Sequence, residues 1–404
     1  MLVVLALAVA GCGGVGVSGA SSAVGNQLTV YSSLPLQGPS GPGSQQIVNG
    51  EKLALSEVGG RIGPFKISYL SMDDSNTSTG EWNPGVTATN AKTAAEDATS
   101  IAYLGDYNSG ATAVSLPLIN ASGILQVSPA SPYVGLTSSL DAGQDEPERF
   151  YPSGSRTFGR LQPGDPVQAE AQVVLMKALA VKRLYVLDDE GPFEVPLAEL
   201  VAGDAERAGI AVVAHDSLDM TGTTATTSFK SKVEKVGESG TQAVFFAGGT
   251  GTGTVALWKQ LHNADPKLLL LGSSDMVNSA FTSEIGGGAA ESTYLTTPIL
   301  PASLYPPPAA QVLARYRQRF GGEGGAYALY GYEAMSVALL AIREAGPRGN
   351  NRQAVVERFF AIKNRDSVLG SYSVEADGET TLSRYGVDRV KNGLAVFYRE
   401  LKVH

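Results

Sequence analysis

The residues with the clearest chemical potential are small polar residues that follow predicted strands. Residues 100–133 predict a buried strand, a polar loop, a helix and a second strand that ends in a loop of small residues. Asn108 or Ser109 would cap the helix, so the first helical amides, including that of Gly110, would lack an acceptor beside the Ser109 hydroxyl. Such an end attracts anions. The residues after the second strand would let backbone donors approach the same ligand closely; they are Pro129, Ala130, Ser131 and Pro132.

An acidic residue further along the chain offers a countercharge. In open α/β sheets, ligands bind beyond the carboxyl ends of the strands. We place these ends at 35–45, 107–110 with Tyr107, 130–133, 188–193, 248–250 with Thr250, and 273–275. A zwitterion could place its carboxylate on the helix end at Ser109 and its ammonium on Asp275, while Phe193 and Tyr327 cover its apolar part. The alternatives are a plain cap or turn role for the two polar residues and a core role for the two aromatic residues.

Catalytic motifs are missing from the sequence. The three histidines, His215, His262 and His404, have no metal-ligand spacing, and the chain has neither a nucleophile elbow nor a phosphate-binding P-loop. The glycine run at 248–254 follows a strand and opens a helix, but its spacing does not match a dinucleotide-binding loop. We therefore expect no enzyme activity, no cofactor and no metal. The catalytic alternative is an exported amide hydrolase that uses Asp188, Asp189 or Asp275 with a water molecule.

The elements that must position these residues alternate between strand and helix from Leu28 onward. This alternation predicts parallel sheets covered by helices, and 404 residues with 43% hydrophobic content are enough for two cores. We expect an α/β protein with two doubly wound, Rossmann-like lobes joined by three hinge crossings. Residues 27–154 and 297–369 would form lobe one, and residues 155–296 and 370–404 would form lobe two. The net charge of -9 and the scattered basic residues argue against nucleic acid as a partner.

The first 26 residues predict an export signal and a flexible tether. Residues 2–10 are all apolar, a run too short to span a bilayer. Val9, Ala10, Gly11 and Cys12 resemble the lipobox of a bacterial lipoprotein, in which Cys12 is acylated, although no Lys or Arg precedes the apolar run. We expect an extracytoplasmic protein anchored to the cell membrane by a lipid on Cys12. A buried free cysteine on a core helix is the alternative.

An ordered series of segments resembles the solute-binding lipoproteins of ABC transporters, specifically the branched-chain amino acid binding type. The segments are the lipobox, LPLQGPSG with NGEKLALSEVGG, YLGDYNSGAT to GILQVSPAS, TSFKSKVEKVGESGTQAVFFAGG, and LLGSSDMV. The resemblance implies the type I periplasmic binding protein fold, in which hinge closure traps a solute and a membrane permease recognises the closed form. A sensory module that reports to a membrane signalling partner is the alternative.

The resemblance also implies roles for single residues. Ser109 and the backbone of Ala130 and Ser131 match positions that hold an amino acid's carboxylate, and Asp275 matches the acidic partner of the ammonium. Phe193 and Tyr327 match aromatic positions over the solute's side chain. Two positions depart from the pattern, because Thr250 stands where leucine-binding members have an aromatic residue and Asp275 is one methylene shorter than the usual Glu. The resemblance therefore implies an amino acid or a related amide or aromatic acid.

Overall fold

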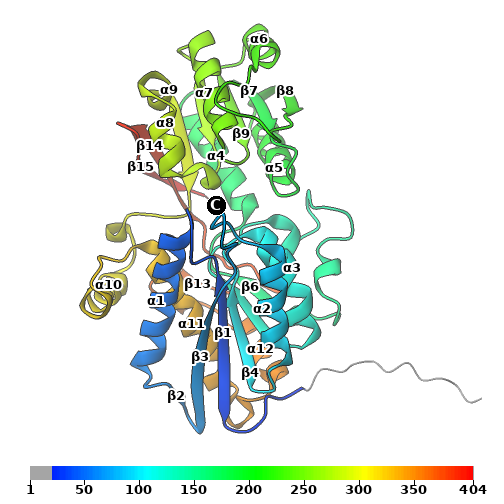
Figure 1. The fold of residues 1–404 in the computed structure, drawn as a ribbon, viewed down its shortest axis with the longest axis vertical. Coiled ribbons are helices and arrows are strands. Elements are labelled where there is room, and N and C mark those ends of the chain that lie inside the picture. The colour runs from blue at the N-terminus through cyan, green and yellow to red at the C-terminus, as the bar shows by residue number, and fades with distance from the viewer. Residues whose placement is uncertain (1–20, 404) are drawn as a thin grey trace, which may run out of the picture.

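Two largely parallel sheets organise residues 21–403, the part of the chain that the computed structural model describes. Each sheet lies at the centre of one lobe, and the lobes are stacked along the long axis of the molecule (Figure 1). The predicted two-lobed α/β architecture is confirmed. The predicted lipidation site, Cys12, and the histidine at 404 lie outside the described residues.

Lobe one is built on a sheet with the order β2-β3-β1-β4-β5-β6, in which only the short β2 runs antiparallel. Its strands are β1 (Gln27–Leu34), β2 (Arg61–Ile62), β3 (Phe65–Asp73), β4 (Ser100–Gly105), β5 (Leu125–Ser128) and β6 (Phe158–Arg160). Its helices are α1 (Gly41–Glu57), α2 (Pro84–Glu96), α3 (Ser109–Ala121), α10 (Pro307–Phe320), α11 (Ala326–Glu344) and α12 (Arg352–Phe360). Apolar residues of α2 and α3 pack on one face of the sheet, and those of α1, α10, α11 and α12 pack on the other.

Lobe two is built on a sheet with the order β15-β14-β11-β10-β9-β7-β8. Its strands are β7 (Arg183–Asp188), β8 (Ala211–Ser217), β9 (Ala243–Ala247), β10 (Leu269–Gly272), β11 (Thr293–Thr297), β14 (Arg384–Lys391) and β15 (Leu394–Lys402), the last two antiparallel to their neighbours. Its helices are α4 (Asp165–Ala178), α5 (Glu194–Arg207), α6 (Lys230–Glu238), α7 (Thr252–Ala264), α8 (Ser279–Glu284) and α9 (Gly287–Glu291). Helices α4 and α5 cover one face, and α6 to α9 cover the other.

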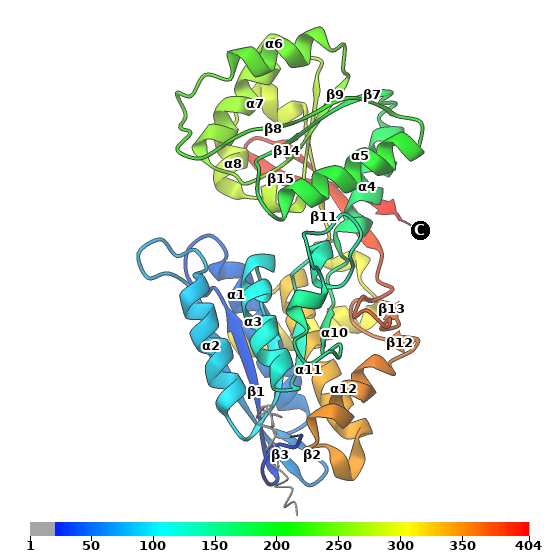
Figure 2. The same cartoon turned by 90° about the vertical axis from the view of Figure 1, so that its right-hand side faces the viewer.

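Three crossings join the lobes, and two of them lie further along the chain than the predicted boundaries. Strand β6 pairs with β5, so lobe one continues past residue 154 and the first crossing follows Arg160. The second crossing follows β11. A hairpin of β12 (Arg365–Asp366) and β13 (Ser371–Tyr372) packs in lobe one, as do the buried side chains of Val374 and Leu382. The third crossing therefore follows Leu382 and leads into β14. Figure 2 shows the crossings gathered on one side of the molecule.

Two helices of lobe one have starts with clear local causes. Asn83 caps α2 by accepting hydrogen bonds from the amides of Gly85 and Val86 at 3.0 and 3.1 Å, and Pro84 occupies the first helical turn. Helix α1 begins at Gly41, inside the stretch predicted as a loop at 35–45, with a proline in its first turn. No helix between residues 21 and 403 combines the length and apolarity that crossing a bilayer requires.

Candidate functional site

The start of α3 forms the first part of the site. Asn108 is the cap residue, and its carbonyl oxygen accepts from the amide of Thr112 at 3.0 Å. The buried Oδ1 of Asn108 has no hydrogen-bond partner among the described residues. Ser109 Oγ accepts from the backbone amide of Tyr133 at 3.2 Å, which ties the helix start to the loop after β5. The amides before Thr112 have no acceptor within the helix, so this end keeps its attraction for anions.

The loop after β5 is held by hydrogen bonds within lobe one. Ser128 Oγ accepts from the amides of both Ala130 and Ser131, at 3.2 and 3.0 Å. The Ser131 hydroxyl is fully buried, donates to the Asp106 carbonyl oxygen at 3.0 Å and lies 2.7 Å from Thr112 Oγ1. Because these donors already have acceptors inside lobe one, Ala130 and Ser131 shape the loop. That the two residues also hold a ligand's carboxylate stays a prediction.

Two aromatic rings, those of Trp82 and Phe193, lie against Gly110. A methyl group on Gly110 would lie 2.6 Å from the ring of Trp82 and 3.2 Å from the ring of Phe193. Phe193, at the start of α5 in lobe two, also meets Tyr133 of lobe one edge to face, with ring centroids 4.9 Å apart. The predicted ligand residues Gly110 and Phe193 are thus in contact across the two lobes. Only a residue without a side chain fits at position 110.

A second aromatic pair lies near Asp275. The hydroxyl of Tyr107 donates to that of Tyr327 at 2.8 Å. Asp275 follows β10 in a short 3₁₀ turn of lobe two (Ser274–Met276) and forms no hydrogen bond with any described residue. Burial raises the pKa of Tyr107 and of Tyr327, the hydrogen bond from Tyr107 opposes the rise at Tyr327, and the charge of Asp275 adds to both shifts. The charge of Asp275 therefore acts on the two tyrosines of the other lobe.

The environment of Asp275 combines exposure with desolvation. Its side chain is exposed to solvent, yet the surrounding protein desolvates the carboxylate and, together with the charge of Asp189, raises its pKa. Asp275 is thus open to water while the surrounding protein still desolvates its carboxylate. An unpaired carboxylate in such a place is ready to receive a cation.

The remaining candidates lie at neighbouring strand ends of lobe two. Thr250 is half-buried, and within the described chain its side chain forms no hydrogen bond. Asp188 Oδ2 lies 2.9 Å from His215 Nε2 and accepts from Ser217 Oγ at 3.1 Å. Burial opposes ionisation of Asp188, but these hydrogen bonds outweigh it and lower the pKa. Both side chains bind the same Asp188 oxygen, which is not the order of a serine–histidine–aspartate relay.

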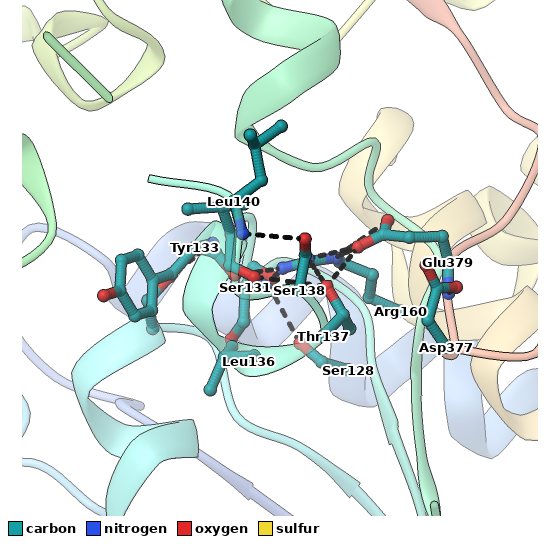
Figure 3. A network of polar contacts seen from close by, with 12 residues as sticks. Ser128, Ser131, Tyr133, Leu136, Thr137, Ser138, Leu140, Arg160, Asp377 and Glu379 are labelled. Atoms are coloured by element: carbon teal, nitrogen blue, oxygen red, sulfur yellow. Dashed lines mark hydrogen bonds and ion pairs between the residues drawn. The ribbon is translucent and has the colours of Figure 1, made fainter. Parts of the chain in front are cut away.

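A buried ion pair connects the site to the crossings (Figure 3). Arg160 Nη1 donates to the carbonyl oxygens of Ser131 and Tyr133 at 2.8 and 2.7 Å. Its Nε donates to Glu379 at 2.8 Å, and Thr137 Oγ1 donates to the same carboxylate at 2.6 Å. Burial alone would lower the pKa of Arg160, but the Glu379 charge raises it. Arg160 ends β6 directly before the first crossing and Glu379 lies just before the third, so one guanidinium ties the site loop to the lobe-one ends of both crossings.

A family model described as periplasmic binding protein matches residues 32–393. The chain belongs to the periplasmic binding protein family. A Leu/Ile/Val-binding protein homologue from Brucella melitensis is 25% identical over 94% of this chain and 95% of its own length. A leucine-binding protein from Thermotoga maritima has a TM-score of 0.73 at 20% identity and covers 93% of this chain and 98% of its own. The predicted type I periplasmic binding protein fold is confirmed.

Ligands vary among structures of this shape. A solute-binding protein of an ABC transporter from R. palustris, solved with benzoate, has a TM-score of 0.68 at 15% identity and covers 93% of this chain and 96% of its own. The fold alone therefore does not identify the solute of this periplasmic binding protein, which must be inferred from its side chains.

Several residues of this periplasmic binding protein were absent from the predicted site. Trp82 lies in a polar loop, and nothing in the sequence indicates its contact with Gly110. Arg160 and Glu379 are 219 residues apart in the chain, so their pairing carries no local signal. Among residues 21–403, no cluster of three or more His, Cys, Asp or Glu side chains is arranged to hold a metal ion.

Proposed function

We propose that this protein is an extracytoplasmic solute-binding protein of an ABC importer. Its solute would be an amino acid or a related zwitterion, bound between the lobes and released unchanged to a membrane permease. Family membership supports the solute-binding role, and the names of the relatives support the choice of amino acids. The site residues also come from both lobes, as hinge closure requires, because a ligand favours closure only through contacts made with both lobes at once.

One observation carries the proposal. The start of α3 in lobe one presents free amides, while Asp275 in lobe two has no hydrogen bond with the described residues and its charge acts on the Tyr107–Tyr327 pair. Groups of opposite sign thus face each other across the lobes. A zwitterion would satisfy both, whereas a neutral solute would leave the Asp275 carboxylate desolvated and unpaired on closure.

Thermal unfolding with a panel of amino acids, amides and small aromatic acids tests this proposal. A true solute at one hundred times its dissociation constant should add about 2.7 kcal/mol to the free energy of unfolding. Asp275→Asn should weaken binding of that solute at least tenfold, because a charge-assisted contact to its ammonium is lost. Asp366→Asn is the matched control, since Asp366 is exposed and its side chain has no hydrogen bond to a described residue. Absence of stabilisation by every compound would refute the proposal.

We also propose that a lipid on Cys12 anchors the mature protein to the outer face of the cell membrane. The support is the sequence at residues 9–12 and the extracytoplasmic location typical of the family. Labelling of cells with a radioactive fatty acid should mark the wild-type protein and not the Cys12→Ser variant. Equal labelling of the two proteins would refute the anchor.

A further inference from the structure

Lobe two places four carboxyl groups around the proposed site. Asp165, Asp189, Glu194 and Asp275 come from the starts of α4 and α5 and from the ends of β7 and β10. None of them forms an ion pair with a residue of the described chain. Arg160, whose charge acts on Asp165, is already paired with Glu379. The site therefore carries more negative charge than one α-ammonium group needs.

The carboxyl groups are close enough to repel one another. Burial and the charges of Asp189 and Asp275 raise the pKa of Glu194 to about 7. Burial raises the pKa of Asp165 well above its usual value, and the charges of Asp275 and Glu194 add to the rise against the opposing effect of Arg160. These shifts mean that some of the carboxyl groups stay protonated near neutral pH. A bound cation would favour their ionised forms.

Asp189 and Glu194 form a pair on the loop that carries Phe193. A methyl group on Gly191 would lie 2.8 Å from Asp189 Oδ1 and would collide with Glu194 Oε2, so both carboxylates flank this glycine. The amides of Gly191 and Gly249 donate to the two oxygens of Asp189, at 3.1 and 2.8 Å, and hold it in place. Glu194 receives only a 3.3 Å bond from the amide of Phe193. Its oxygens retain acceptor capacity directly beside the ring that reaches Gly110.

Unpartnered polar atoms next to the site point independently to a ligand. The Tyr385 side chain is fully buried, and its hydroxyl forms no hydrogen bond of normal geometry in the described part of the chain; the charges of Asp165 and Asp275 and the nearby Ser274 hydroxyl act on it. In lobe one, the buried Oδ1 of Asn108 likewise lacks a donor. Buried polar groups are normally paired, so these two atoms indicate that hydrogen-bonding groups of a solute complete the site.

We propose that the solute is an α-amino acid whose side chain ends in a cation, with its α-ammonium on Asp275 and its side-chain cation between Asp189 and Glu194. This inference rests on the function proposed above and names the class of solute. A branched-chain side chain would leave two carboxylates facing each other without a counterion as the lobes close. A side-chain ammonium or guanidinium would satisfy both.

Calorimetry with L-lysine and L-norleucine tests the assignment, because the two differ only in the terminal amine. Lysine should bind at least tenfold more tightly than norleucine. Glu194→Gln should remove most of that difference by weakening lysine binding at least tenfold, while norleucine binding stays the same. Glu199→Gln, an exposed position on the same helix, is the matched control and should change neither affinity.

Proton uptake or release in wild-type protein gives a second readout that needs no variant. Lysine binding should release protons near pH 7, because a bound cation lowers the pKa of Glu194. The proton release appears as a dependence of the measured binding enthalpy on the ionisation enthalpy of the buffer. Binding of norleucine or leucine as tightly as lysine, or lysine binding without proton release, would overturn the cationic assignment and leave the solute-binding function standing. Failure of every amino acid to bind would instead refute that function.

Discussion

Replacing one buried carboxylic acid in lobe one should make the protein more stable at neutral pH. Glu51 on α1 is fully buried, and Tyr69 donates a 2.5 Å hydrogen bond to its Oε2. Its Oε1 has no partner among the described residues, and the nearby hydroxyl of Ser32 also lacks one. Burial raises the pKa of Glu51 to about 8 from an ordinary value of 4.5, although the hydrogen bond from Tyr69 and the nearby Ser32 hydroxyl oppose the rise. At neutral pH the acid is therefore protonated in the folded protein.

The sign and size of the effect follow from proton linkage. Between pH 4.5 and 8 the folded state holds a proton that the unfolded state has released, so this group's contribution is fully present at acid pH and is lost as the pH rises towards 8. At about 1.4 kcal/mol per pKa unit, the loss reaches about 3 kcal/mol at pH 7 and at most about 5 kcal/mol above pH 8. Glu51→Gln has the shape of the protonated acid and does not titrate, so it avoids this loss.

Urea unfolding from pH 4 to pH 8 measures the difference directly. We expect Glu51→Gln to match wild type within about 1 kcal/mol at pH 4 and to exceed it by about 3 kcal/mol at pH 7. Glu344→Gln, at an exposed position on α11, should stay within about 0.5 kcal/mol of wild type throughout. Other buried acids titrate equally in wild type and variant, so they cancel. A parallel pH profile for Glu51→Gln and wild type would refute the reasoning.

Two further predictions concern the site and the crossings. Gly110→Ala should weaken solute binding at least tenfold in calorimetry, because the methyl group would displace Trp82 and press on Phe193, whereas Gly237→Ala on α6, where a methyl group meets nothing within 4 Å, should not. Unchanged binding by Gly110→Ala would contradict the placement of the site. Arg160→Met should lower the free energy of unfolding in urea by about 3–5 kcal/mol, since it leaves the Glu379 carboxylate unpaired. Exposed Arg348→Met should leave it unchanged, and an equally small effect at Arg160 would contradict a structural role for the pair.

The fold was predictable because its signals are local and repeated. Apolar runs such as 101–104 are long enough for a strand and too short for a helix, and each is followed by turn residues and a helical pattern. The boundaries between lobes were not predictable to the same precision. Strand β6 has only three residues, in a stretch rich in Pro, Gly and Ser that is typical of a linker, and its place in the first sheet depends on pairing with β5.

The candidate site residues were predictable only where the order of strands and helices alone determines their position. Tyr107, Gly110, Phe193 and Asp275 follow strands whose carboxyl ends must share an edge, and the structure brings these residues to the facing ends of the two lobes. The sequence does not indicate in which direction a side chain points. The sequence shows a serine at 131, but not that its hydroxyl turns inward to the Asp106 carbonyl oxygen.

The contacts of Tyr133 suggest how binding is transmitted to the crossings. Its ring meets Phe193 of lobe two, its amide binds Ser109, and its carbonyl oxygen accepts from Arg160. Arg160 in turn holds Glu379, just before the third crossing. A solute that draws Phe193 towards Gly110 therefore acts on the same loop that the Arg160–Glu379 ion pair fixes. Since a packed loop tied by these contacts has few alternative arrangements, lobe movement is expected to occur as rotation about residues 161–164, 298–301 and 382–384 and not as deformation of the loop itself.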